Sequence, residues 1–175
     1  CADFPKVDPE RIAIDPGLPK NKHMRWAALL RHQTPEEAVA ILRQLKLDND
    51  TINRVKTLVQ WWKRPVGADQ TQIRRTMSQM APELYDDLLV LKTSVGELEL
   101  QAEGCVEDLD WVKAQTGEIR QRGDCVSLKE LAVTGADLIQ AGMKPGKELG
   151  ETLKRLLELV LEHPEWNTKE ILKKV

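Results

Sequence analysis

One stretch near the C-terminus combines the residue types that bind phosphate groups. From Gly142 to Arg155 it reads GMKPGKELGETLKR, so glycines alternate with lysines around one proline. Glycine leaves the main chain open to a close ligand, and the first turn of a helix presents N–H groups that attract anions. Lysine and arginine neutralise phosphates without reading a base sequence. The stretch therefore predicts a phosphate-binding corner.

The candidate contact residues fall into a main group and a lesser one. The main group is Gly142, Lys144, Gly146, Lys147, Gly150, Lys154 and Arg155, and the lesser one is Arg120 and Arg122 at the end of the preceding helix. The alternative is structural: the glycines allow tight helix packing, the lysines are solvated, and the two arginines complement a helix C-terminus. The residues alone favour this alternative, because many helix N-termini bind nothing.

Capping and breaking residues indicate the elements that position this corner. Thr134 is the expected N-cap of a short helix, and Gly142 is expected to end it. Pro145 lies close to the start of a longer helix, which Pro164 ends. Asn167 or Thr168 is expected to cap one last turn. The apolar face of the longer helix comprises Leu149, Leu153, Leu156, Leu157, Val160 and Leu161.

The residues before this stretch also show helical spacing. Thr34-Pro35 predicts a helix start, and Gly96 is expected to interrupt a helix over 83–95. Arg74 and Arg75 are predicted to point outward from their helix, and Trp61 and Trp62 cannot both face one core. Further helices are expected over 24–31, 51–62, 68–80 and 105–121.

These patterns predict an all-α fold: an irregular multi-helix body followed by a small helical tail. The expected domain limits are 1–22 for an irregular lead-in, 23–123 for the helical body and 124–175 for the helical tail. The lead-in is set apart by its prolines and glycine.

Composition limits the classes of protein to which the chain can belong. Of its 175 residues, 41% are hydrophobic and 31% are charged, which is typical of a soluble globular protein. The formal net charge of −2 counts against a dedicated nucleic-acid binder but leaves room for a local basic strip. No apolar run reaches the roughly 20 residues of a membrane span. Three cysteines without a CxxC pair favour a reducing, cytoplasmic location.

Motifs of common catalytic sites are absent from the sequence. There is no GxGxxG, no GxxxxGK followed by Ser or Thr, and no GxSxG. The three histidines are far from the cysteines in sequence, which disfavours a zinc site. Asp48-Asn49-Asp50 is more simply read as a helix cap. We therefore expect no catalytic residue, no metal ligand and no cofactor in this chain.

The C-terminal stretch resembles the tail of bacterial class II CCA-adding tRNA nucleotidyltransferases and their poly(A) polymerase relatives. A weaker resemblance covers RWAALL, Arg25–Leu30. The residues that match the tail are Leu131, Ala132, Val133, Gly135, Asp137, Leu138, Ile139, Gly142, Pro145, Gly146, Leu149, Gly150, Leu153, Pro164, Asn167, Thr168, Glu170 and Leu172.

The resemblance implies that the nine candidate residues grip the elbow and acceptor arm of tRNA. It also implies an N-terminal catalytic head that adds nucleotides with Mg²⁺, so tRNA and this head are the expected partners. The chain has no Asp-x-Asp pair in a strand pattern, and we expect it not to polymerise nucleotides by itself. Leu30 is followed by Arg31-His32-Gln33 where many relatives have His-Asp, so an intact phosphohydrolase site is not expected either.

Two other functions stay open on the sequence. One is a helical protein-interaction or dimerisation module without RNA binding, which the adjacent tryptophans Trp61 and Trp62 favour slightly. The other, less favoured, is a degenerate phosphohydrolase.

Overall fold

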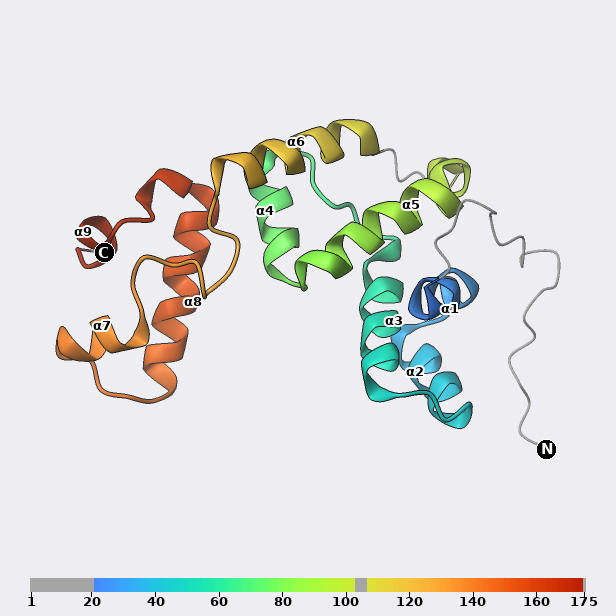
Figure 1. Ribbon diagram of the computed structural model, residues 1–175, viewed down its shortest axis with the longest axis horizontal. Coiled ribbons are helices and arrows are strands. Elements are labelled where there is room, and N and C mark those ends of the chain that lie inside the picture. The colour runs from blue at the N-terminus through green and yellow to red at the C-terminus, as the bar shows by residue number, and fades with distance from the viewer. Residues whose placement is uncertain (1–20, 103–106, 175) are drawn as a thin grey trace. The chain divides into compact units, whose positions relative to one another are not determined.

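The computed structural model describes residues 21–102 and 107–174, and within 95–102 it describes the backbone only. Every regular element in these residues is a helix, which confirms the all-α prediction (Figure 1). Most of the predicted lead-in, residues 1–20, lies outside the described residues. The elements are α1 (Lys22–Leu30), α2 (Pro35–Gln44), α3 (Asn49–Trp62), α4 (Gln70–Ser78), α5 (Pro82–Ala102), α6 (Leu109–Arg122), α7 (Gly135–Gln140), α8 (Lys147–Glu162), the 3₁₀ turn η2 (Pro164–Trp166) and α9 (Lys169–Leu172).

The chain forms two compact units, and each consists of two segments. Unit 1 contains the residues up to 65 together with 82–109, and unit 2 contains 66–81 together with 110–175. α4 therefore belongs to the same unit as α6 and the tail, although it lies between α3 and α5 in the sequence. The limits at residues 22 and 123 stay a prediction, since the compact units divide the chain at other positions.

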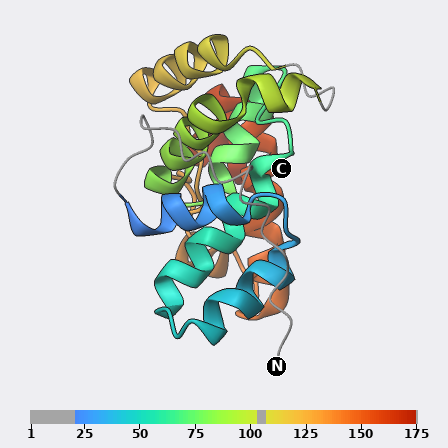
Figure 2. The same cartoon turned by 90° about the vertical axis from the view of Figure 1, so that its right-hand side faces the viewer.

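In unit 1, α3 is the central helix and packs against α1, α2 and α5 (Figure 2). Its buried side chains recur at helical spacing, which confirms the helix predicted over 51–62. Asp48 caps the helix by accepting a hydrogen bond from the Thr51 N–H at 2.9 Å. The buried residues of α3 are Thr51, Ile52, Val55, Leu58, Val59 and Trp62.

The start of α2 confirms the Thr34-Pro35 prediction. Thr34 Oγ1 accepts a hydrogen bond from the Glu37 N–H, and Glu37 Oε2 accepts one from the Thr34 N–H at 2.9 Å. This reciprocal pair satisfies two N–H groups that the helix itself cannot bond. Pro35 follows the cap, where its fixed φ suits the first helical position.

In unit 2, the tail has a core of its own. α7 and α9 lie on α8 through apolar side chains, and Leu156 and Val160 supply the α8 side of the contact. Burying each such side chain stabilises the fold by about 2 kcal/mol. The buried members of the core are Cys125, Leu131, Val133, Leu138, Leu156, Val160 and Leu172.

Two sequence-based predictions were wrong. Helix α5 continues through Gly96 to Ala102, because one glycine costs a helix only about 1 kcal/mol and does not have to end it. Arg74 points inward rather than outward and is 4% exposed. Its neighbour Arg75 is exposed, as predicted.

Candidate nucleic-acid interface

The corner begins at the end of α7. Thr134 and Asp137 form a capping box at the start of this helix, and Asp137 also pairs with Lys169 at 3.1 Å. Gly142 ends the helix with φ of +103°, while the Gly142 N–H bonds the Ile139 carbonyl and the Met143 N–H bonds the Leu138 carbonyl. This pair of bonds is a Schellman motif, and only glycine adopts its left-handed position without strain.

The corner ends where α8 begins. Gly146 is the N-cap residue, with φ of +156°, and no side chain of the described chain caps the helix there. The first N–H groups of α8 therefore face solvent at the positive end of the helix dipole. α2, α3, α4, α7 and α9 have a side-chain cap, whereas α8, like α1, has none.

The three glycines of the corner have open space around them. A Cβ atom built on Gly142, Gly146 or Gly150 would meet no atom within 4 Å, whereas one on Gly135 would lie 3.4 Å from Leu149. Tight packing therefore accounts for Gly135 and not for the other three. Gly142 and Gly146 have a positive φ, which explains why glycine stands at these two positions. Gly150 lies inside α8, where alanine would be better by about 1 kcal/mol, so nothing within the chain explains it.

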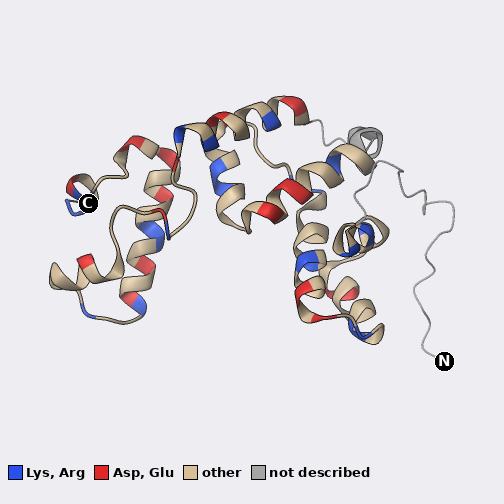
Figure 3. Ribbon diagram, in the orientation of Figure 1, with Lys and Arg blue, Asp and Glu red and all other residues tan. Residues whose placement is uncertain are grey.

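The cations of the corner are exposed, but carboxylates lie among them. The Lys147 side chain is 90% exposed and lies 3.7 Å from Glu151 in a weak surface pair. Glu148 occupies the first turn of α8. Figure 3 shows the two signs alternating along α8. Within the described part of the chain, Lys144, Lys154 and Arg155 have no ion-pair partner, so their charges are available to an external anion.

Further along α8, Lys154 and Arg155 border an open depression of about 470 Å³. Its other lining residues are Glu158, Leu159 and Glu162. Arg75 of α4 pairs with both glutamates, and its Nε lies 3.2 Å from Glu158. Hydrogen bonding to Glu158 raises the pKa of Arg75. The negative charges of Glu158 and Glu162 are therefore paired with Arg75 and not with Lys154 or Arg155.

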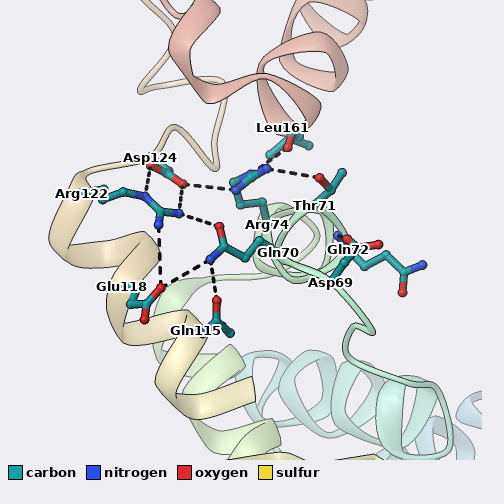
Figure 4. A network of polar contacts seen from close by, with 10 residues as sticks. All are labelled: Asp69, Gln70, Thr71, Gln72, Arg74, Gln115, Glu118, Arg122, Asp124 and Leu161. Carbon is teal, nitrogen blue, oxygen red and sulfur yellow. Dashed lines mark hydrogen bonds and ion pairs between the residues drawn. The ribbon is translucent and has the colours of Figure 1, made fainter. Parts of the chain in front are cut away.

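The structure does not bring Arg122 to this corner. Its Nε and one Nη lie 3.2 Å and 2.9 Å from the two carboxylate oxygens of Asp124, which raises the pKa of Arg122 (Figure 4). Arg120 lies exposed in the same last turn of α6. Arg120 and Arg122 remain predicted phosphate contacts, but they do not belong to the corner between Gly142 and Arg155.

The sequence analysis missed the role of Arg74 in unit 2. Its Nε donates to the Leu161 carbonyl at 2.7 Å, and its Nη atoms donate to Asp124 at 3.3 Å and to Thr71 at 3.2 Å. It thereby ties α4 to the C-terminal end of α8 (Figure 4). This end is about 20 Å from the corner, since Leu161 follows Lys147 by 14 residue steps and each step rises about 1.5 Å along the helix. No local signal marks the role, because Asp124 and Leu161 are distant in sequence.

Two searches of the described residues bear on other kinds of site. No three His, Cys, Asp or Glu side chains of these residues are grouped so that they could hold a metal ion. None of their helices has the length and hydropathy of a membrane span.

Comparison with models of protein families shows the family of the chain. The model described as tRNA nucleotidyltransferase domain 2 matches residues 19–175. No curated protein and no solved structure matches the chain.

Proposed function

Because the chain belongs to the tRNA nucleotidyltransferase domain 2 family over residues 19–175, we propose that it is the RNA-binding part of a tRNA nucleotidyltransferase. In this proposal its tail grips the elbow and acceptor arm of tRNA during nucleotide addition to the 3′ end. The addition itself is assigned to a separate catalytic head that uses Mg²⁺.

The observation that carries the proposal is the open space at Gly150 together with the uncapped helix start three residues before it. Gly117 has the same open space but lies in the middle of α6. A glycine on an exposed helix face weakens the helix, and neither packing nor backbone conformation requires one here. A ligand backbone that passes close to the helix does require one, since a Cβ would keep it away. The uncapped N–H groups after Gly146 and the exposed Lys144 and Lys147 lie around the same position. This combination suits the phosphates of a nucleic acid.

Phosphate contacts also fit a protein with a small negative net charge. Between Gly142 and Arg155 there are four cations and two acids, so the corner is locally positive while the whole chain is at −2. Contacts of this kind position an RNA by shape and carry no sequence information. A protein that serves many tRNAs needs this property.

The test is tRNA binding by a charge-reversed corner. We expect Lys144→Glu with Lys147→Glu to weaken tRNA binding at least tenfold and to flatten its dependence on salt, because two phosphate contacts are lost. The matched control is Arg43→Glu with Lys46→Glu, which makes the same charge change at exposed positions of unit 1. Equal affinities of the two double variants in a filter-binding titration would remove the assignment to the corner.

A protein-interaction module remains the second candidate. It is favoured by apolar side chains on the surface of unit 2, where Leu128 is 46% exposed and Ile139 44%. Sedimentation of the chain with and without tRNA separates the two functions. A dimer that forms without RNA, combined with no tRNA binding, would support the module and contradict RNA binding.

A further inference from the structure

The exposed face of α3 is rich in cations towards its C-terminal end, after the pair that Arg54 forms with Asp50. From Asn53 to Arg64 the sequence reads NRVKTLVQWWKR, which contains four cations and no acid. The inward side of this segment is buried against α1, α2 and α5. Asn53, Lys56, Gln60, Lys63 and Arg64 are exposed on the opposite side. In a chain with more acids than bases, a helix face of this kind is a local positive strip.

An aromatic ring lies at the C-terminal end of this strip. Trp62 is buried, whereas Trp61 is partly exposed, with the Arg64 guanidinium 5.4 Å from its ring centroid. The ring and the guanidinium are both planar groups on which a nucleobase can stack. The sequence analysis predicted that the two tryptophans face different ways, and the structure confirms it.

The end of α3 is held in place from inside unit 1. Lys92, which is 1% exposed, donates a hydrogen bond from Nζ to the Arg64 carbonyl at 2.7 Å and pairs with Glu107 at 3.1 Å. A buried charge keeps such partners because leaving it unpaired is strongly destabilising. The backbone that carries Trp61 and Arg64 is therefore fixed before any ligand arrives, which lowers the entropy lost on binding.

We propose that this face of α3 is a second RNA-contact surface, in which Lys56 and Arg64 meet phosphates and Trp61 stacks an unpaired base. The choice of RNA as the ligand rests on the proposed function. The cations of this face, which complement phosphate charges, and the partly exposed Trp61 ring support an RNA ligand independently of the tail. Stacking on an aromatic side chain tolerates any base, since every base has a π face. The surface therefore favours single-stranded or unpaired RNA, whereas the corner in unit 2 suits phosphates alone.

The experiment compares two RNAs and two matched double variants of the full chain. The RNAs are a transfer RNA and a single-stranded 12-nucleotide RNA of mixed sequence, titrated at several salt concentrations. The first variant is Lys56→Gln with Arg64→Gln. Its control, Arg43→Gln with Lys46→Asn, removes two exposed cations from α2 and the turn after it. Asparagine is chosen because Lys46 has φ of 56°, which asparagine tolerates.

We expect the α3 variant to bind the single-stranded RNA about tenfold more weakly. The slope of log K against log salt should fall by about 1.4, or 0.7 for each lost contact. The control should stay within a factor of about two of the parent chain. Trp61→Leu should lower the affinity about tenfold, and Trp61→Phe should restore most of it, because phenylalanine can still stack. The thermal midpoint of each variant shows whether the fold is kept.

Each outcome decides between the two surfaces. If the corner variant loses tRNA binding while the α3 variants bind both RNAs as the parent does, the inference is wrong and the proposed function stands. If the α3 variants lose binding and the corner variant does not, the inference stands and the corner assignment is wrong. A parent chain that binds neither RNA contradicts both. If Trp61→Leu changes sedimentation but not RNA affinity, the face binds protein instead.

Discussion

The side-chain amide of Asn167 bonds the backbone on both sides of Leu131. Its Oδ1 accepts a hydrogen bond from the Ala132 N–H at 2.8 Å, and its Nδ2 donates to the Glu130 carbonyl at 3.0 Å. One of these bonds is partly buried and the other is exposed, and a single side chain supplies the partner in both. The next residue, Thr168, caps α9 through the Ile171 N–H. The Asn-Thr pair therefore has a structural role in the tail.

Replacing Asn167 should destabilise the tail. We expect Asn167→Ala to lower the free energy of unfolding by about 1–3 kcal/mol, since two backbone groups lose their partner. The measurement is urea unfolding followed by circular dichroism. Gln140→Ala is the control, because this exposed amide of α7 should change stability by less than about 0.5 kcal/mol. Equal midpoints for both variants would contradict the role of Asn167.

Replacing Arg74 should destabilise unit 2. We expect Arg74→Met to cost about 1–3 kcal/mol, because the Leu161 carbonyl loses its donor and Asp124 keeps only Arg122 as a partner. Arg75→Gln is the control, and its surface pairs should contribute less than about 1 kcal/mol. Urea unfolding measures both. A double-mutant cycle with Asp124→Asn should give a coupling energy of about 0.5–3 kcal/mol, and a value near zero would show that the contact contributes nothing.

Replacing Gly150 separates stability from RNA binding. We expect Gly150→Ala to stabilise the chain by up to about 1 kcal/mol, because alanine favours the helix. It should also weaken tRNA binding, because the new Cβ occupies the open space. Gly117→Ala is a matched control, since Gly117 lies inside α6 and a Cβ there also meets nothing within 4 Å. This control should gain similar stability and bind tRNA normally. Unchanged tRNA affinity of Gly150→Ala would count against the corner.

Asp137 should make the tail sensitive to acid. Hydrogen bonds from Thr134, and then the pairing with Lys169, lower the pKa of Asp137 below its usual value near 4. A lowered folded-state pKa gives stability that is present above about pH 4 and is lost as the pH falls further. We expect the thermal midpoint of the parent chain to fall more steeply between about pH 4 and pH 2.5 than that of Asp137→Asn. Parallel curves would exclude Asp137 as a source of the acid sensitivity.

Local signals were sufficient to predict much of the fold. The helix starts at Thr34 and Thr134 and the helix end at Gly142 depend only on residues within one turn, so the sequence predicts them correctly. Thr168, one of two predicted caps, is the residue that caps α9. The other, Asn167, bonds a segment some 35 residues away, which no local pattern indicates.

Non-local contacts account for what the sequence did not predict. The charge of Arg74 predicts an exposed side chain. The side chain is buried instead, because Asp124 and the Leu161 carbonyl accept hydrogen bonds from its guanidinium group. For the candidate site, the sequence predicted an exposed glycine corner and the residues around it. Two local pairs were also missed: Lys147 with Glu151, whose i,i+4 spacing could have indicated it, and Arg122 with Asp124, two residues away.

The interleaving of the two units sets an order for folding during synthesis. α4 leaves the ribosome before α5, but the helices α6 and α8 that complete its unit are made later. Unit 1 can close once residue 109 has emerged, with the α4 segment looped out. Until α8 is made, Arg74 has no Leu161 carbonyl to bond, so a nascent chain that stalls before that point would expose the inner side of α4 to chaperones and proteases.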